Sequence, residues 1–192
     1  SMATQIMVAY AIAKYDFRLK PLLYGVAVIV MLLPIIGSLA SEVQMADTFN
    51  FRNNLLGICL MKCKYAGLYF LVFYATFRSV SWTYAEAAQV DGAGDYTIYF
   101  KIMFPQILNI FGALFVLAWV ADWNNYSSVL VYLPKIPTLA GGIYLFQAKA
   151  QSIVRQDYLY AAYFIVSIPP LLLFAFFNKA FTSNISLGGV KE

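Results

Sequence analysis

Four long apolar runs restrict what this chain can fold into. They cover residues 22–40, 55–77, 105–133 and 158–181, and the first contains no charged residue at all. Each run is close to or longer than the roughly 20 residues that an α-helix needs to cross the hydrocarbon core of a bilayer. The sequence therefore predicts an all-α, polytopic membrane protein with about four full transmembrane helices.

The composition agrees with this prediction. Hydrophobic residues make up 62% of the 192 residues and charged residues only 11%, whereas a soluble domain carries about 25% charged residues. The net charge is +4 and the cations are scattered, so the pattern predicts membrane lipid, and no nucleic acid, as a partner. The chain has no histidine, which removes the commonest general base and metal ligand.

The first 13 residues form a shorter apolar segment that ends at the basic residues Lys14, Arg18 and Lys20. This segment lacks the basic start and the cleavage pattern of a signal peptide. Thirteen residues are too few to span a bilayer, so we expect residues 1–13 to be a partial transmembrane helix whose beginning is missing.

The distribution of lysine and arginine predicts the orientation. The connections after residue 13 and after residue 77, together with the C-terminal tail, hold more of these cations than the other two connections. Positively charged loops stay in the cytoplasm. We therefore expect residues 83–104 to form a cytoplasmic loop.

The loop 83–104 has the pattern of two helices separated by glycine. Thr83 and Glu86 fit a capping box, and Asp91-Gly92 is typical of a helix C-terminus. Asp95 is suited to cap a second helix. One apolar stripe is expected on that second helix, formed by Tyr96, Tyr99, Phe100, Met103 and Phe104.

The same loop resembles the EAA loop of ABC importer permeases. The resemblance rests on Glu86-Ala87-Ala88, Asp91-Gly92-Ala93, Phe100, Ile102 and Pro105. Residues 119–126, 137–142 and 187–191 further resemble the carbohydrate-uptake branch of that family, which includes the maltose-type permeases. Residues 158–162 depart from the tryptophan-glycine usual in that branch, which leaves the substrate class open.

The resemblance implies the type I ABC importer permease fold in a single transmembrane domain, residues 1–192, and a multi-pass location in the bacterial cytoplasmic (inner) membrane. It implies that Glu86, Ala87, Ala88, Asp91 and Gly92 couple this chain to an ATPase. The expected partners are a homologous second permease subunit, two ATPase subunits and an extracytoplasmic solute-binding protein. ATP and Mg would be held by the ATPase, because this sequence has no phosphate-binding loop. We expect no catalytic residue, metal or cofactor in this chain.

Two groups of residues are candidates for the substrate pathway. The first is Lys62, Tyr65 and Tyr69, which share one face if residues 55–77 form a continuous helix. Lys62 would then favour a sugar substrate that is hydroxyl-rich or acidic, whereas Lys64 lies on a leucine-rich face. The alternative is that both lysines extend their charged ends out of the bilayer.

The second group is Asp122, Asn124 and Asn125, which would line the outer part of the cavity, since polar groups at membrane depth must face protein or water. The alternative for this group is the interfacial end of a transmembrane helix, flanked by aromatic residues.

Three further expectations come from the sequence. By resemblance, residues 147–156 would reach into the binding protein, or else form a solvated loop. The tail 187–191 would contact the ATPase, or else fray. Cys59 and Cys63 are expected to be buried thiols. The alternative functions are an importer permease for a non-sugar solute, an intramembrane enzyme and a structural scaffold.

Overall fold

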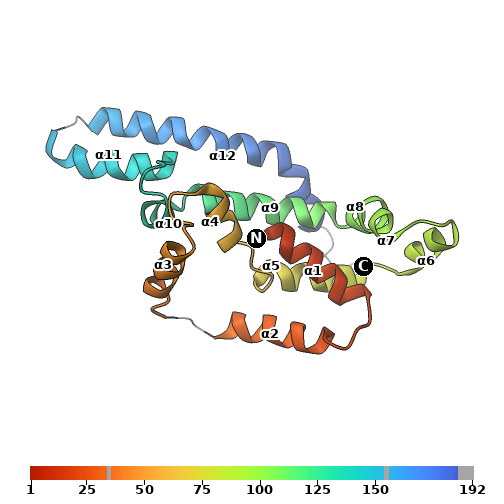
Figure 1. The fold of residues 1–192 in the computed structure, drawn as a ribbon. Helices are drawn as coiled ribbons and strands as arrows, with labels where there is room; N and C mark the ends of the chain where they lie inside the picture. The colour runs from red at the N-terminus through yellow and green to blue at the C-terminus, as the bar shows by residue number, and fades with distance from the viewer. Residues whose placement is uncertain (34–35, 154–155, 186–192) are drawn as a thin grey trace. The chain divides into compact units, whose positions relative to one another are not determined.

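The computed structural model describes residues 1–33, 36–153 and 156–185. All regular secondary structure in these residues is helical, as the ribbon in Figure 1 shows. The prediction of an all-α fold is confirmed. The chain divides into two compact units, and each of them is described by itself.

The first unit is built around two helices that lie side by side, α1 (Met2–Lys14) and α5 (Leu68–Ser79) (Figure 1). Helix α2 (Lys20–Leu32) contacts both of them. The same unit contains α6 (Thr83–Val90), α7 (Asp95–Thr97), the π-helix η1 (Ile98–Met103), α8 (Phe104–Gln106) and the first half of α9 (Leu108–Trp123). Most of the buried core side chains come from α1, α5 and η1, and they include Ile6, Ile12, Phe70, Phe73, Phe77, Ile98 and Met103.

One buried polar contact joins the two central helices. Helix α5 begins after Gly67, which has no side chain to cap it. The backbone N–H of Phe70 instead donates to Oε1 of Gln5, on α1, at 3.1 Å. The first N–H groups of a helix have no partner within the helix. Gln5 therefore supplies the cap of α5 from another element.

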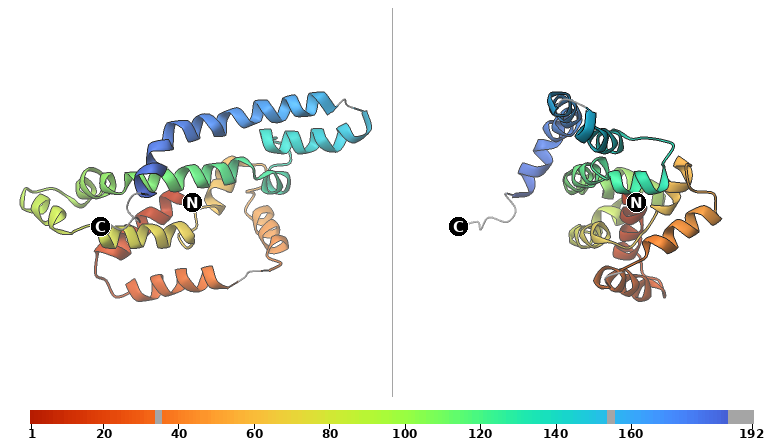
Figure 2. Two further views of the ribbon diagram at one scale, coloured as in Figure 1. Left: turned by 180° about the vertical axis from the view of Figure 1, so that it is seen from behind. Right: turned by 90° about the vertical axis from the view of Figure 1, so that its left-hand side faces the viewer.

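The second unit contains α3 (Leu39–Thr48), α4 (Leu55–Met61), the second half of α9, α10 (Tyr126–Tyr132), α11 (Leu139–Ile153) and most of α12 (Gln156–Ile185). Helix α11 runs back along α12 in both figures (Figure 2). Polar contacts join the shorter elements. The hydroxyl of Tyr132 donates to Glu42 at 3.0 Å, and Asn53 accepts from the N–H of Lys135 at 2.9 Å.

Among the described residues, one helix is long and apolar enough to cross a membrane, Gln156–Asn178, with 23 residues. A second span results if Asp95–Gln106 and Leu108–Trp123, which are bent by 79° at their junction, are counted as one. Lys20–Leu32 and Leu139–Ala148 are shorter apolar helices.

Several helices are shorter than the apolar runs from which they come. In the run 22–40, α2 ends at Leu32 and α3 begins at Leu39, with Gly37 at φ 81° between them. The run 105–133 is divided into α8, α9 and α10. Within 158–181, by contrast, α12 is continuous through Pro169 and Pro170.

The run 55–77 is not one continuous helix, as its hydrophobicity had suggested. Helix α4 ends at Met61 and α5 begins at Leu68. The interval between them holds Lys62, Lys64 and Gly67, and both glycine and charged side chains favour an exposed connection over an apolar helix. The expectation of buried thiols is also wrong, because Cys59 and Cys63 are exposed.

Candidate coupling loop and polar cluster

One face of helix α6 is exposed, and the other packs against the core of the first unit. Ala85 is completely buried and Ala88 packs partly against the same core. Glu86 and Ala87 are exposed, and Val90 is 88% exposed. A short helix that shows aliphatic and carboxylate groups together offers a small mixed surface to another protein.

The C-terminal end of α6 is fixed by its backbone. Asp91 is the last half-helical residue, and Gly92 has φ 81°. The N–H of Gly92 donates to the carbonyl of Gln89 at 3.0 Å, and the N–H of Ala93 donates to the carbonyl of Ala88 at 2.9 Å. These two bonds define a Schellman motif. The prediction that Asp91-Gly92 ends the helix is confirmed.

The predicted capping box at the other end of α6 is wrong. The helix already includes Thr83, and its N-cap is Trp82, which makes no side-chain cap bond within the described structure. The hydroxyl of Ser81 lies near this end and accepts from the N–H of Thr83 at 3.3 Å. Asp95 is likewise the first residue of α7 and not its cap, since Gly94 holds that position.

The stripe predicted for the second helix is also partly wrong. Ile98, Tyr99, Met103 and Ile107 are buried, whereas Tyr96 and Phe100 are exposed. The reason is the π-helix η1, in which the backbone bonds join residues five apart. That spacing places Ile98 and Met103 on one face. The α-helical period used for the sequence does not apply here.

The buried face of η1 ties the loop to the rest of the first unit. The ring of Tyr99 lies 4.8 Å from that of Tyr10, on α1, between centroids. Burial raises the pKa of the Tyr99 phenol above its ordinary value, because the charged form would lose its hydration. Helix α6 also contacts η1, so a displacement of α6 would be passed to this packed core.

The second candidate cluster is a salt bridge in the other unit. Nζ of Lys62, at the end of α4, lies 2.8 Å from Oδ1 of Asp122, near the end of α9. The two side chains remain 44% and 65% exposed. Both residues were candidates from the sequence, but their pairing could not be found from spacing, since they are 60 residues apart.

Aromatic side chains line a hollow beside Asp122. A hollow of about 280 Å³ is lined by Trp119, Asp122 and Trp123 together with 138–140. The two indole rings are stacked, with their centroids 4.7 Å apart. Stacked rings beside a carboxylate provide the apolar face and the hydrogen-bond acceptor that sugar rings use.

The two asparagines have different environments. Asn125 caps α10, because its side chain accepts from the N–H of Ser128 at 3.1 Å. Asn124 lines a larger hollow of about 540 Å³ with Tyr144, Gln147 and Tyr163. Asn125 thus has a structural role as a helix cap, whereas the polar side chain of Asn124 faces a cavity.

Lys62, Tyr65 and Tyr69 do not share a helical face. Lys62 ends α4, Tyr65 follows in the connection, and Tyr69 belongs to α5. Tyr65 and Tyr69 both pack against the core of the first unit. Lys64 uses its backbone carbonyl to accept from the hydroxyl of Thr4 at 3.2 Å. The prediction that these three residues lie on one face of a continuous helix is therefore wrong, while the role of Lys62 in the substrate pathway stays a prediction.

Two regions proposed from the resemblance lie partly or wholly beyond the described residues. The loop 147–156 begins within α11, which reaches Ile153, and resumes with α12 at Gln156. Residues 154–155 fall outside the described part. The tail 187–191 is entirely outside it.

Comparison with known proteins identifies a family over almost the whole chain. Residues 5–187 match the family described as binding-protein-dependent transport system inner membrane component. This match includes α6, the Lys62–Asp122 pair and the whole of the loop 147–156.

Three similar proteins illustrate the range of relatives. The arabinooligosaccharides transport system permease protein of Bacillus subtilis is 25% identical, over 96% of this chain and 66% of its own length. The melibiose/raffinose/stachyose import permease protein of the same species is 26% identical, over 96% and 68%. The sn-glycerol-3-phosphate transport system permease protein of Pectobacterium atrosepticum is 24% identical, over 96% and 66%. The chain therefore spans about two thirds of the length of these relatives.

Proposed function

This chain belongs to the family of binding-protein-dependent transport system inner membrane components, and we propose that it is a permease subunit of an ATP-driven sugar importer. Membership places it in a membrane transport system. The relatives compared above are named as permeases and not as enzymes. The proposal adds a multi-pass topology and a share of the solute pathway.

The observation that carries the coupling proposal is the construction of α6. Its outer face is exposed, its end is fixed by Gly92, and its inner face contacts the buried π-helix η1. A helix held in this way moves as a rigid body when a partner pushes on it. We propose that a separate ATPase binds Glu86, Ala87 and Ala88, while Asp91 and Gly92 hold the helix end in position.

The proposed substrate is a sugar or oligosaccharide. Of the three relatives described, one is named for arabinooligosaccharides, one for melibiose, raffinose and stachyose, and one for sn-glycerol-3-phosphate. The carboxylate of Asp122 balances the charge of Lys62. This pair favours a neutral sugar over an acidic one, because no net charge is offered to the solute.

The proposed assembly contains a second permease, two ATPase subunits and an extracytoplasmic solute-binding protein. The family description itself names a binding protein. ATP and Mg would be bound by the ATPase subunits. The loop 147–156 is proposed to contact the binding protein, and the tail 187–191 to contact the ATPase.

Replacement of Gly92 tests the coupling proposal. In Gly92→Val a β-branched residue would have to adopt φ 81°, which L-residues disfavour by about 1–2 kcal/mol or more. Gly92→Asn is the matched control, since asparagine tolerates this conformation best after glycine. A Cβ at this position meets no other atom within 4 Å, so the comparison isolates the backbone effect.

The expected result is normal membrane insertion of both variants and a loss of coupled transport in Gly92→Val alone. The measurements are the yield in the membrane, the amount of co-purified ATPase, and sugar uptake per ATP hydrolysed. If Gly92→Val takes up sugar like the unmodified protein, α6 is not the coupling element.

A further inference from the structure

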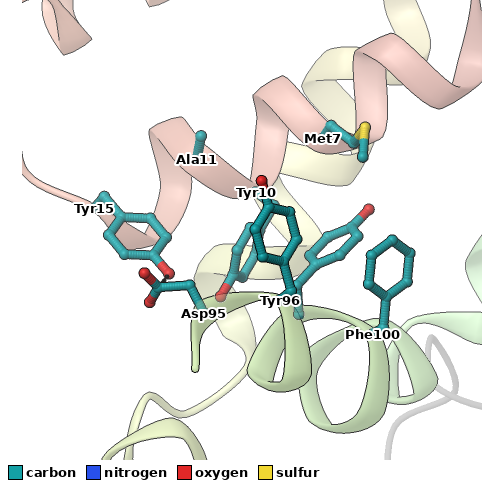
Figure 3. Close-up of a pocket in the computed structure, with 8 residues that line it drawn as sticks. Met7, Tyr10, Ala11, Tyr15, Asp95, Tyr96 and Phe100 are labelled. Atoms are coloured by element: carbon teal, nitrogen blue, oxygen red, sulfur yellow. Dashed lines mark hydrogen bonds between the residues drawn. The ribbon is translucent and has the colours of Figure 1, made fainter. Parts of the chain in front are cut away.

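Aromatic side chains and one carboxylate line a pocket of about 280 Å³ in the first unit. Figure 3 shows its two sides, with Met7, Tyr10, Ala11 and Tyr15 on α1 and its C-terminal end, facing Asp95, Tyr96 and Phe100 on the segment after α6. Tyr99 completes the lining. None of these residues belongs to the solute path or to the coupling residues proposed above.

The rings are held by contacts with one another. Tyr10 and Tyr99 are buried, with their ring centroids 4.8 Å apart, and Phe100 meets Tyr99 edge to face, also at 4.8 Å. At the rim, Tyr96 is 82% and Phe100 is 54% exposed. The pocket therefore has a fixed aromatic floor and an accessible aromatic rim.

The carboxylate of Asp95 gives the pocket its charge. It accepts a hydrogen bond from the hydroxyl of Tyr15 at 3.0 Å. Across the described residues, no lysine or arginine lies within ion-pair distance of it. Lys14 precedes Tyr15 in sequence, but its Nζ donates to the carbonyl of Val80 and lies over the Trp82 ring. The negative charge of Asp95 is thus not neutralised by a lysine or arginine of the described residues.

We propose that this pocket binds the alkylammonium group of a small organic cation. The faces of tyrosine and phenylalanine rings carry negative electrostatic potential and attract such groups within about 6 Å. A carboxylate at the wall adds a full charge of the same sign. The volume suits an ammonium group with its methyl or methylene substituents and is too small for an oligosaccharide. The group comes either from a free amine or from a phospholipid headgroup.

Choline tests the site directly. The full chain is reconstituted in nanodiscs of phosphatidylglycerol, and choline binding is measured by calorimetry against 3,3-dimethylbutan-1-ol, its neutral isostere. We expect saturable choline binding that is at least about tenfold tighter than that of the isostere. Equal binding of the two molecules would show that the pocket recognises shape alone and would overturn the proposal.

A lipid arm separates the two sources of the ammonium group. Phosphatidylethanolamine is added to the nanodiscs in increasing amounts, while the fraction of phosphatidylglycerol is kept constant. If the apparent affinity for choline falls, the headgroup occupies the pocket, and if it is unchanged, the ligand is a free cation. If choline does not bind, the proposal is wrong. Protection of the Tyr96→Cys variant from thiol modification by the purified ATPase would then identify the pocket as a protein contact.

Matched variants test the chemistry of the site. Asp95→Asn keeps an acceptor for Tyr15 and removes the charge, so choline affinity should fall about tenfold. Phe100→Leu removes a rim ring that is half exposed and should weaken binding about threefold. Asp16→Asn changes the net charge by the same amount, but this residue pairs with Lys20 at 2.8 Å and does not line the pocket. Circular dichroism confirms that each variant is folded.

The control separates a specific site from general attraction. We expect Asp16→Asn to bind choline like the unmodified chain. An equal loss of choline affinity in Asp16→Asn and Asp95→Asn would mean that choline responds only to the net charge of the chain. Unchanged binding in a folded Asp95→Asn variant would exclude the carboxylate from the site, and either result would overturn the proposal.

Discussion

The two units of this chain bury their apolar side chains to very different degrees. In the described part of the first unit, thirteen buried residues form one cluster that draws mainly on α1, α5 and η1. In the described part of the second unit, the buried hydrophobic residues are Ala46, Val116 and Leu133, and none of the most apolar window of α12 is buried. The first unit is thus stabilised by its own packing, while the second leaves most of its described apolar side chains exposed.

The strongest test of this difference compares two phenylalanines. Phe73 is completely buried in the first unit, and Phe176 is 85% exposed on α12. Phe73→Ala should lower the free energy of unfolding by about 3–5 kcal/mol, because it leaves a cavity. Phe176→Ala should change it by less than about 0.5 kcal/mol in the isolated chain. Denaturant titration in detergent measures both.

The same two variants can be compared in the proposed assembly with a second subunit. If α12 faces a neighbouring subunit, Phe176→Ala should weaken assembly while leaving the isolated chain unaffected. Comparable destabilisation by both variants in the isolated chain would mean that the second unit buries more surface than its structure indicates.

A polar contact within the core of the first unit gives the next effect. Gln5→Leu removes the acceptor for the N–H of Phe70, and a buried donor without a partner costs about 1–3 kcal/mol. Gln106→Leu is the control, since that exposed side chain only donates to the carbonyl of Ile102 at 3.2 Å. Thermal unfolding should separate the two, and identical melting temperatures would remove Gln5 as the cap of α5.

The second unit contains one tight backbone contact, between Gly57 and Phe51. A Cβ at Gly57 would lie 2.6 Å from Cα of Phe51, whereas a Cβ at Gly142 meets nothing within 4 Å. Gly57→Ala should cost about 1–2 kcal/mol through overpacking, after the helical gain of alanine is subtracted. Gly142→Ala should stabilise by up to about 1 kcal/mol. Unfolding titrations of both variants decide whether this unit has one well-packed point.

The smallest effect is expected from the Lys62–Asp122 pair. Both side chains are largely exposed, so a double-mutant cycle with Lys62→Met and Asp122→Asn should give a coupling energy of about 0.2–1 kcal/mol. Raising the salt concentration should reduce it. A coupling energy above about 2 kcal/mol would indicate a desolvated pair and a more enclosed second unit. Sugar uptake by the same variants tests the pathway role separately.

Local chemistry explains what the sequence could predict. The end of α6 was predictable because glycine at a left-handed position is decided within a few residues. The helical class was predictable from the apolar runs, which are a property of the whole chain. The exposed face of α6 also followed from its small and polar residues.

Long-range contacts explain what could not be predicted. The cap of α5 comes from Gln5, 65 residues away, and the partner of Lys62 is 60 residues away. Neither distance leaves a periodic signal. Hydrophobicity alone predicts that the helix continues after Met61. The helix ends there because the charged residues and the glycine that follow favour an exposed connection, although the run is apolar on average. The aromatic pocket between α1 and the segment after α6 was missed because its two walls, which carry Tyr15 and Asp95, are 80 residues apart in sequence.

The length of the π-helix η1 determines the direction in which α6 faces. One turn of this six-residue segment takes up about one residue more than an α-helical turn. Each residue of an α-helix advances the chain by about 100° around the axis. Deleting one residue between Ile98 and Met103 would therefore turn α6 by roughly that angle relative to Ile107, without altering any residue of α6. The direction in which α6 faces is thus specified partly by the length of η1, which lies outside α6.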